Sequence, residues 1–358
     1  MRAPGIAQVR TRLAKLWHRS QPVGLILLYH RVADLEADPQ LLAVGVQRFA
    51  DQMAHLSQRY EAVTLHEMIR RRSIHSETDR PLVAVTFDDG YADNLANAKP
   101  ALEAAHVPAT VFVASGYMGG EQPFWWDELE SIFLRPSSLP EILLLSVDGQ
   151  MRKWVLGQDA VYDDAQCSAN RGWDVLCRED PTRRHQLYRE LCAILRLMAE
   201  ADRERTLCAI RSWAGHQSAR ASSPRILTPQ DVRTLASGPW VDVGAHSESH
   251  PVLARLSLGG QREEIGRCKE RLQSVLSRPV TSFAYPYGTR ADYTADTTAL
   301  VKEEGYSLAC SNYPERVTRD TDVYQLPRFV VRNWDTDRFH TMLELWWQGK
   351  TGAEEHAH

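Results

Sequence analysis

Short apolar runs alternate with segments of helical spacing over the first 120 residues. The runs predict buried strands at 24–29, 81–87 and 109–114. Between them, apolar residues recur at helical spacing over 47–59, and a second helix is expected over 93–105. Strand, helix and strand in this order predict parallel strands, either in an α/β sheet or in a barrel.

This alternation breaks over residues 121–222. Two apolar segments flank the pair Asp148 and Gly149, which favours a hairpin turn. Helices are expected over 182–213, where leucine and isoleucine recur along one face. We therefore interpret 121–222 as an insertion into one barrel-like domain rather than as a second catalytic domain.

The alternation resumes after residue 222. Thr228 and Pro229 fit the N-cap and the first position of a helix. Further elements are expected as helices over 261–276 and 295–304 and as strands over 240–244, 280–284, 306–309 and 323–331. Seven or eight short strands interleaved with helices fit a (β/α) barrel better than an open sheet, although element order alone allows both. We place the barrel at 23–120 and 223–345 and a tail at 346–358.

Composition narrows the class of protein. Of the 358 residues, 43% are hydrophobic and 25% are charged, as in a soluble globular enzyme. The net charge of -4 gives no overall basic field for binding nucleic acid. No stretch approaches 18 consecutive apolar residues. The six cysteines include no C-x-x-C pair, which suits reduced thiols better than disulfides or a structural zinc site.

Residues 1–22 carry five basic residues and no acidic one, with apolar residues at near-helical spacing. This pattern predicts a basic helix, which could bind an anionic membrane surface through residues 1–20. The commoner alternative is a helix packed on the body with its basic face in water. The apolar run that follows is too short for a signal peptide and precedes no small-residue cleavage site. We therefore expect a cytoplasmic location, with any membrane contact at the inner face.

Three motifs each follow a predicted strand, where the loops of a (β/α) barrel build active sites. Asp88 and Asp89 directly follow the strand at 81–87. Adjacent carboxylates repel each other unless they share a cation or a proton, so a metal bound by one would keep the other ionised as a base. The alternative is a helix N-cap and a turn, which Asp-Asp-Gly alone favours.

The second motif contains His246 and His250. At the i, i+4 spacing the two imidazoles would share one helical face and could chelate one ion. With one aspartate they form a three-ligand set that leaves positions for water and substrate, as in a catalytic site. Two surface histidines that cap a turn are the alternative.

The third motif, at 283–288, surrounds Tyr285 and Tyr287 with Pro286 and Gly288. It predicts a tight loop whose backbone N–H groups could form an oxyanion hole. An ordinary aromatic turn is the alternative, because such turns are common.

Together and in this order, the three motifs resemble those of the polysaccharide deacetylases, also called the NodB-homology domain or carbohydrate esterase family 4. The resemblance covers most of 24–335 outside the insertion. It implies a distorted (β/α) barrel and an enzyme that removes acetyl groups from sugars with a divalent metal, commonly zinc. It also implies these roles: Asp88 as general base, Asp89, His246 and His250 as metal ligands, and the Tyr287 N–H as an oxyanion donor.

The chain departs from the usual family pattern at two places. Ala284 stands where the common form has an arginine that orients the base, and we offer Arg328 as its substitute. No late Leu-x-His motif supplies a general acid, and His340 does not fit one. His30 resembles instead the acid histidine of permuted family members, such as the bacterial poly-N-acetylglucosamine deacetylases. We assign the acid role to His30, the alternative being a strand-end histidine bonded to the backbone.

Four aromatic residues are candidates for substrate binding. Trp125 and Trp126 could form a stacking platform for sugar rings, or could pack in the core of the insertion. Tyr91 and Tyr285 are cleft candidates with the same alternative. With Arg328, these residues make up the predicted substrate-facing set.

We therefore predict a metal-dependent carbohydrate N-deacetylase, a hydrolase of non-peptide C–N bonds, in polysaccharide or glycoconjugate biosynthesis. Its substrate would be an N-acetylated sugar, an oligosaccharide or a lipid-linked saccharide, and the last would suit the basic N-terminal segment. One alternative is the same machinery acting on another small amide, such as a formamido sugar or a cyclic imide. Another is a non-catalytic sugar-binding module, against which the complete motif set argues because a binder needs no base beside a metal.

Overall fold

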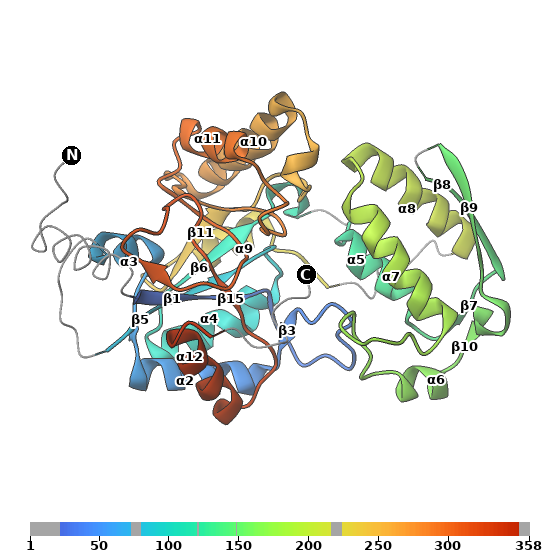
Figure 1. Cartoon of the computed structure of the whole chain (residues 1–358), viewed down its shortest axis with the longest axis horizontal. Helices are drawn as coiled ribbons and strands as arrows, with labels where there is room; N and C mark the ends of the chain where they lie inside the picture. Colours follow the sequence, from blue (N-terminus) through green and yellow to red (C-terminus); the bar gives the residue numbers. More distant parts are fainter. Residues whose placement is uncertain (1–21, 73–79, 120–121, 148, 216–223, 351–358) are drawn as a thin grey trace, which may run out of the picture.

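A curved, mostly parallel sheet forms the centre of the larger part of the molecule (Figure 1). Its strands in spatial order are β13 (Leu308–Cys310), β12 (Ser282–Ala284), β11 (Val241–Ala245), β6 (Ala109–Val113), β5 (Leu82–Phe87), β1 (Pro22–Tyr29) and β14 (Val317–Thr318). Only β14 in this series pairs antiparallel, with β1, and the short strands β4 (Glu61–Ala62) and β15 (Phe329–Val330) pair with β5 and β1. The predicted distorted (β/α) barrel is therefore confirmed, as a sheet curled into part of a barrel.

The structure is a computed structural model that describes residues 22–72, 80–119, 122–147, 149–215 and 224–350. The predicted basic helix at 1–22 lies outside the described residues, apart from Pro22. Within the described part, none of the helices has the length and apolar character needed to span a membrane.

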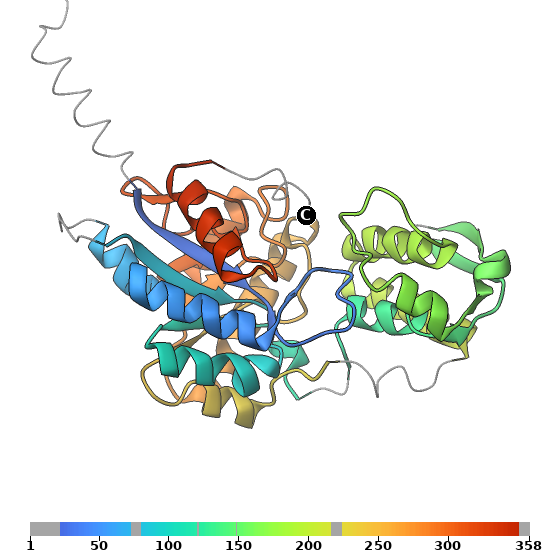
Figure 2. The ribbon, with the colours of Figure 1, turned by 90° about the horizontal axis from the view of Figure 1, so that it is seen from below.

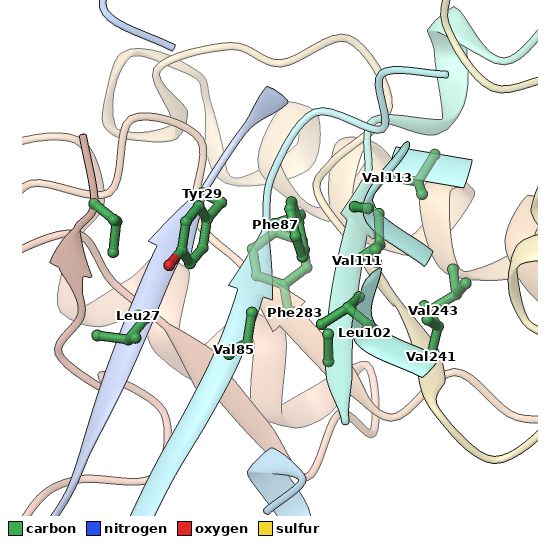
Figure 3. Packing of buried hydrophobic residues seen from close by; sticks show 14 of the residues in the cluster. Leu27, Tyr29, Val85, Phe87, Leu102, Val111, Val113, Val241, Val243 and Phe283 are labelled. Atoms are coloured by element: carbon green, nitrogen blue, oxygen red, sulfur yellow. The ribbon is translucent and has the colours of Figure 1, made fainter. Parts of the chain in front are cut away.

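In the described part of the chain, seven α-helices surround the sheet: α2 (Val46–Arg59), α3 (Leu65–Arg71), α4 (Lys99–Ala105), α9 (Pro229–Leu235), α10 (Leu258–Leu276), α11 (Ala295–Glu303) and α12 (Thr336–Trp347). Successive side chains of a strand point to opposite faces. Leu27 and Val85 therefore join the main core beneath the helices (Figure 3), whereas Ile26 and Ala84 face the other side of the sheet. The sheet is buried on both faces, which explains the uninterrupted apolar runs in the sequence.

Two element boundaries differ from the prediction. The strand expected over 323–331 is only β15, because a turn precedes it and Pro327 has no N–H for a ladder. We expected the tail to begin at residue 346, but α12 extends to Trp347. Trp346 is fully buried and stacks on Phe329. Its indole fixes the end of α12 to the sheet.

The segment between β6 and α9 forms a separate lobe (Figures 1 and 2). Its main elements are α5 (Trp125–Phe133), the hairpin β8 (Ile142–Val147) and β9 (Gln150–Val155), α6 (Asp164–Ala169), α7 (Arg183–Arg196) and α8 (Glu200–Ala214). The short strands β7 (Ser137–Ser138) and β10 (Val161–Tyr162) pair with each other. The lobe has an apolar core of its own, to which α5, α7 and α8 contribute. It also contributes two arginines to the junction with the barrel, as described below.

Candidate active site

The candidate residues gather where the parallel strands end. His30 follows β1 and Asp88 follows β5, and the pairing of Tyr29 with Phe87 puts these two positions beside each other. The Asp88 N–H donates to the Tyr29 carbonyl at 3.0 Å, which fixes this neighbourhood. His246 follows β11 in the same way at the same edge of the sheet. This is the edge where (β/α) folds build their sites.

Asp89, His246 and His250 form a compact cluster, which we call the Asp-His-His cluster. One ligand atom from each lies within 4.8 Å of the others, and all three residues are buried. The Asp89 Oδ1 atom is 3.6 Å from His246 Nε2 and 3.4 Å from His250 Nε2. Ligands about 2.1 Å from a tetrahedral ion lie about 3.4 Å from one another. The donor set and its spacing therefore fit a divalent metal.

The backbone reaches this geometry through left-handed conformations. Asp89, Ser247 and His250 have φ values of 74°, 62° and 55°, which few residues other than glycine adopt. The expectation that His246 and His250 share a helical face is wrong, because the segment between them is a loop. The Glu264 carboxylate on α10 holds that loop by accepting from two of its backbone N–H groups and from the Ser249 hydroxyl. Left-handed conformations of residues other than glycine are strained, and they persist where packing and hydrogen bonds enforce them.

The two histidines present Nε2 to the cluster. His246 Nδ1 is 2.8 Å from the Ala284 carbonyl oxygen, so Nδ1 carries the proton and Nε2 is left as a ligand atom. Burial lowers the pKa of His246, but Asp88 and Asp89 outweigh it and the pKa is raised. For His250, burial dominates and lowers the pKa, which favours the neutral form that a metal needs.

Arg328 holds Asp88 in a buried bidentate pair. Its two terminal nitrogens donate to the two Asp88 carboxylate oxygens at 2.7 Å each, and its Nε donates to the Ser311 carbonyl at 2.7 Å. Burial raises the pKa of Asp88, but the charges of Arg328 and His246 outweigh it and keep the pKa below its usual value. Asp88 is thus an ionised carboxylate whose Oδ2 lies 3.8 Å from His246 Nε2.

His30 directly follows β1, close enough to the same carboxylates for their charges to act on its pKa. Burial lowers its pKa, while the negative charges of Asp89 and Asp88 oppose that shift. The Asn94 side chain donates to the His30 carbonyl at 2.8 Å and holds the chain where the strand ends. The imidazole therefore lies within electrostatic reach of the cluster and of Asp88.

With this geometry in place, comparisons with known proteins identify the family. A model of the family described as polysaccharide deacetylase matches residues 75–139 and 189–309, more than half of the chain. The chain belongs to the polysaccharide deacetylase family. It is therefore a hydrolase of non-peptide C–N bonds, of the carbohydrate deacetylase type. A search of curated proteins found no significant match to this sequence.

Solved structures agree on the fold of this deacetylase. The deacetylase PplD of Streptococcus pyogenes in complex with acetate is 16% identical, with a TM-score of 0.56, covering 90% of this chain and 99% of that one. IcaB from Ammonifex degensii is 19% identical, with a TM-score of 0.53, covering 92% of this chain and 98% of that one. At these identities the likeness concerns the fold alone.

The deacetylase places Tyr287 directly against the cluster. Its ring meets that of His250 edge-on at 4.7 Å between centroids, and its backbone has a φ of 59°. Gly288 donates to the Pro286 carbonyl at 2.6 Å and closes the tight turn expected from the motif. Among the described residues, the Tyr287 amide donates no backbone hydrogen bond, so it is available to another acceptor.

Two of the four aromatic candidates lie inside the protein. Tyr285 is fully buried, donates to the Tyr324 carbonyl at 2.9 Å and stacks on Tyr293, so its proposed place in the cleft is wrong. Tyr91 is also fully buried, and its hydroxyl accepts from Trp126 at 2.8 Å and donates to Asp127 at 2.9 Å. Both tyrosines are therefore structural supports rather than sugar-facing residues.

The tryptophans also favour the core-packing alternative. Trp125 and Trp126 are about 5% exposed and belong to the core of the lobe. The Trp126 ring stacks on Phe124 and meets His250 edge-on at 5.2 Å. Trp126 thus supports a metal-ligand candidate instead of offering an open platform, whereas Trp125 lines a pocket described below.

Arg196 and Arg203 were missed at the level of sequence. Arg196 at the end of α7 lies over the Tyr287 ring at 4.5 Å, and Arg203 on α8 donates to the Ser249 carbonyl at 3.2 Å. No motif marks either residue. A signal was nevertheless available for Arg203, because it occupies the buried stripe that also contains Leu207 and Ile210. A charge on the apolar face of a helix is unusual enough to indicate a function.

Proposed function

We propose that this deacetylase is metal-dependent and hydrolyses the N-acetyl groups of amino sugars. The observation that carries the proposal is the buried Asp-His-His cluster beside an ionised carboxylate, Asp88, held by Arg328. A divalent ion bound by Asp89, His246 and His250 would polarise the acetyl carbonyl and lower the pKa of a water molecule. We propose zinc, because two histidines and one aspartate at tetrahedral spacing suit it and leave a position open.

Three residues around the cluster have separate roles in the reaction. Asp88, fixed by Arg328, accepts a proton from the attacking water as general base. The Tyr287 N–H donates to the oxygen of the acetyl group as negative charge develops on it. His30 donates a proton to the amine as the C–N bond breaks, since an amine leaves poorly as an anion. The substrate class is then an N-acetylated saccharide, and the acyl product is acetate.

Acetate release tests this proposal directly. Purified protein is expected to contain about one equivalent of a divalent metal and to release acetate from N-acetylglucosamine oligomers. A chelator should abolish release, and added zinc should restore it, because the open metal site supplies the activated water. Metal-replete protein that releases formate but not acetate from matched N-acyl sugars would support the formamido alternative. Protein without metal or turnover would contradict the proposal.

His30→Gln is expected to slow N-deacetylation by about 10²-fold, the typical contribution of a general acid. The same variant should hydrolyse an aryl acetate ester almost as well as wild type, because a phenolate leaves without a proton. The kcat values of both substrates for both proteins provide the test. An equal loss on both substrates would instead assign His30 a structural role at the end of β1.

A cytoplasmic location, a lipid-linked substrate and a role in polysaccharide or glycoconjugate biosynthesis stay proposals that rest on sequence. The basic segment that suggests membrane contact lies outside the described residues. Full acetate release from soluble oligomers, unchanged by deletion of residues 1–20, would argue against the membrane part.

A further inference from the structure

A pocket of about 760 Å³ lies at the junction of the lobe and the barrel. Its walls include Trp125 from α5, Arg203 from α8 and the segment with Ser249 and Pro251. These last two residues flank His250 in the chain, so the pocket borders the loop that carries this member of the Asp-His-His cluster.

Arg203 is a buried cation with unsatisfied hydrogen-bonding capacity. Its side chain is only 3% exposed, and its Nη1 has no hydrogen-bond partner among the described residues. Its Nη2 donates to a neutral acceptor, the Ser249 carbonyl, at 3.2 Å. A buried guanidinium without a carboxylate partner destabilises the fold. This destabilisation is offset when a ligand brings the missing negative charge.

Three further buried polar groups near Arg203 have hydrogen-bonding capacity left among the described residues. They are Trp125 Nε1, the Tyr287 hydroxyl and Arg196 Nε. The Trp125 side chain lies within hydrogen-bonding reach of the Tyr287 hydroxyl, both arginines lie close enough to lower the pKa of that hydroxyl, and the Arg196 guanidinium lies over the Tyr287 ring. We call these four groups the donor cluster. All four can donate hydrogen bonds, and none of the charged ones is an acceptor.

Six glutamates line the pocket, but in the described part of the chain no ion pair joins any of them to Arg203. Glu248 and Glu263 lie near Arg267, at 3.9 and 3.7 Å. Glu128 and Glu204 both pair with Arg211, at 2.8 and 2.5 Å. Glu264 accepts from the loop before His250. Glu200 occupies the exposed first position of α8. The Asp292 carboxylate accepts hydrogen bonds from Arg196 Nη2. The Nε atom of Arg196 has no partner among the described residues.

We infer that the donor cluster binds an oxyanion carried by the substrate, a carboxylate or a phosphate group attached to the N-acetylated saccharide. Arg203 is then the residue that sets the preference for acidic over neutral sugars. A guanidinium with free N–H groups is suited to both anions, because its planar fork matches two of their oxygens. The inference rests on the proposed function, which places the sugar at the Asp-His-His cluster.

The test compares three substrates with wild-type and Arg203→Met protein. They are a neutral N-acetylglucosamine oligomer, an oligomer alternating N-acetylglucosamine with a uronic acid, and an N-acetylglucosamine oligomer with a terminal phosphate. We expect wild type to show at least a tenfold higher kcat/KM for one anionic class, and this class identifies the anion as carboxylate or phosphate. In Arg203→Met, the ratio of kcat/KM for that class to kcat/KM for the neutral oligomer should fall by about tenfold or more, as expected for the loss of one charged hydrogen bond.

Arg267→Met is the matched control, since Arg267 lines the same pocket but is exposed and reaches carboxylates of Glu248 and Glu263. It should leave the preference unchanged. Equal kcat/KM values for all three oligomers in wild type would overturn the inference, as would an equal loss on all three in Arg203→Met. If no oligomer releases acetate, the proposed function fails separately. Calorimetric binding of the same oligomers to chelated protein then decides whether Arg203 selects the anion.

Discussion

Asp88→Asn is expected to lower kcat/KM for N-acetylated oligomers by about 10³-fold, within the range that a general base contributes. The substitution keeps the shape of the side chain but removes its ability to accept a proton from water. Bound metal should stay near wild-type content, because Asp88 lies outside the Asp-His-His cluster. Acetate-release kinetics with metal analysis on the same samples provide the measurement. Activity within about threefold of wild type would exclude Asp88 as the base.

The same substitution should also destabilise the fold, because it leaves the Arg328 guanidinium buried and uncompensated. Breaking a buried ion pair costs about 3 kcal/mol of unfolding free energy. The double variant Asp88→Asn/Arg328→Met removes both charges and should be more stable than Asp88→Asn alone, while remaining inactive. Denaturant unfolding of the three proteins separates the loss of chemistry from the loss of stability. A double variant less stable than Asp88→Asn would contradict this account of the pair.

The sign of the pH dependence follows from the direction of the Asp88 pKa. Since the folded pKa lies below the ordinary value of 3.8, folding favours the ionised carboxylate. The pair therefore contributes its full stabilisation well above pH 3.8, and loses it as the pH falls toward the folded pKa. Unfolding free energy in wild type should decline on acidification through this range, and Asp88→Asn should show a shallower decline.

Asp89→Asn is expected to remove most of the bound metal and to lower activity by at least about 10²-fold, because it takes the only anion from the cluster. Asparagine is the suitable replacement because, like aspartate, it tolerates the positive φ of 74° found at this position. Metal content after dialysis and acetate release are the two measurements. Excess zinc should recover part of the activity if the loss is one of affinity.

Asp127→Asn is the matched control for that experiment. Asp127 is an equally buried aspartate near the site, but it accepts from Tyr91 and lies outside the cluster. Burial raises its pKa well above the ordinary value, so a neutral amide changes the local charge little. Metal content and activity should stay close to wild type. Equal metal loss in both variants would mean that any buried aspartate here is needed for folding, and would contradict the specific role of Asp89.

Local patterning predicted most of the elements of the barrel. The buried strands β1, β5 and β6 are uninterrupted apolar runs because both faces of the sheet are covered. The start of α9 was also readable, since Thr228 forms a capping box with Asp231 and Pro229 follows. The length of the strand expected over 323–331 was overestimated. The sequence shows apolar residues there but not their hydrogen-bond partners, so an apolar loop at the sheet edge resembles a strand.

The chemistry-bearing residues of the motifs were visible in the sequence because each follows directly on a strand. Strand ends of a parallel sheet meet at one edge, so His30, Asp88 and His246 are brought together by the register alone. The helical face assigned to His246 and His250 was wrong because sequence spacing does not reveal the left-handed residues that bend this loop.

What the sequence by itself determined is therefore local: the apolar periods, the caps and the residue types that follow each strand. Tertiary structure decided the contacts between distant segments. It formed the bidentate pair of Arg328 with Asp88, 240 positions away, for which the sequence offered Arg328 only as a candidate substitute. It also turned Tyr285 into the core and brought Arg203 from the lobe to the loop before His250. The physical reason is that a period or a cap depends on neighbours a few residues apart, whereas charge pairing and burial depend on how the whole chain packs.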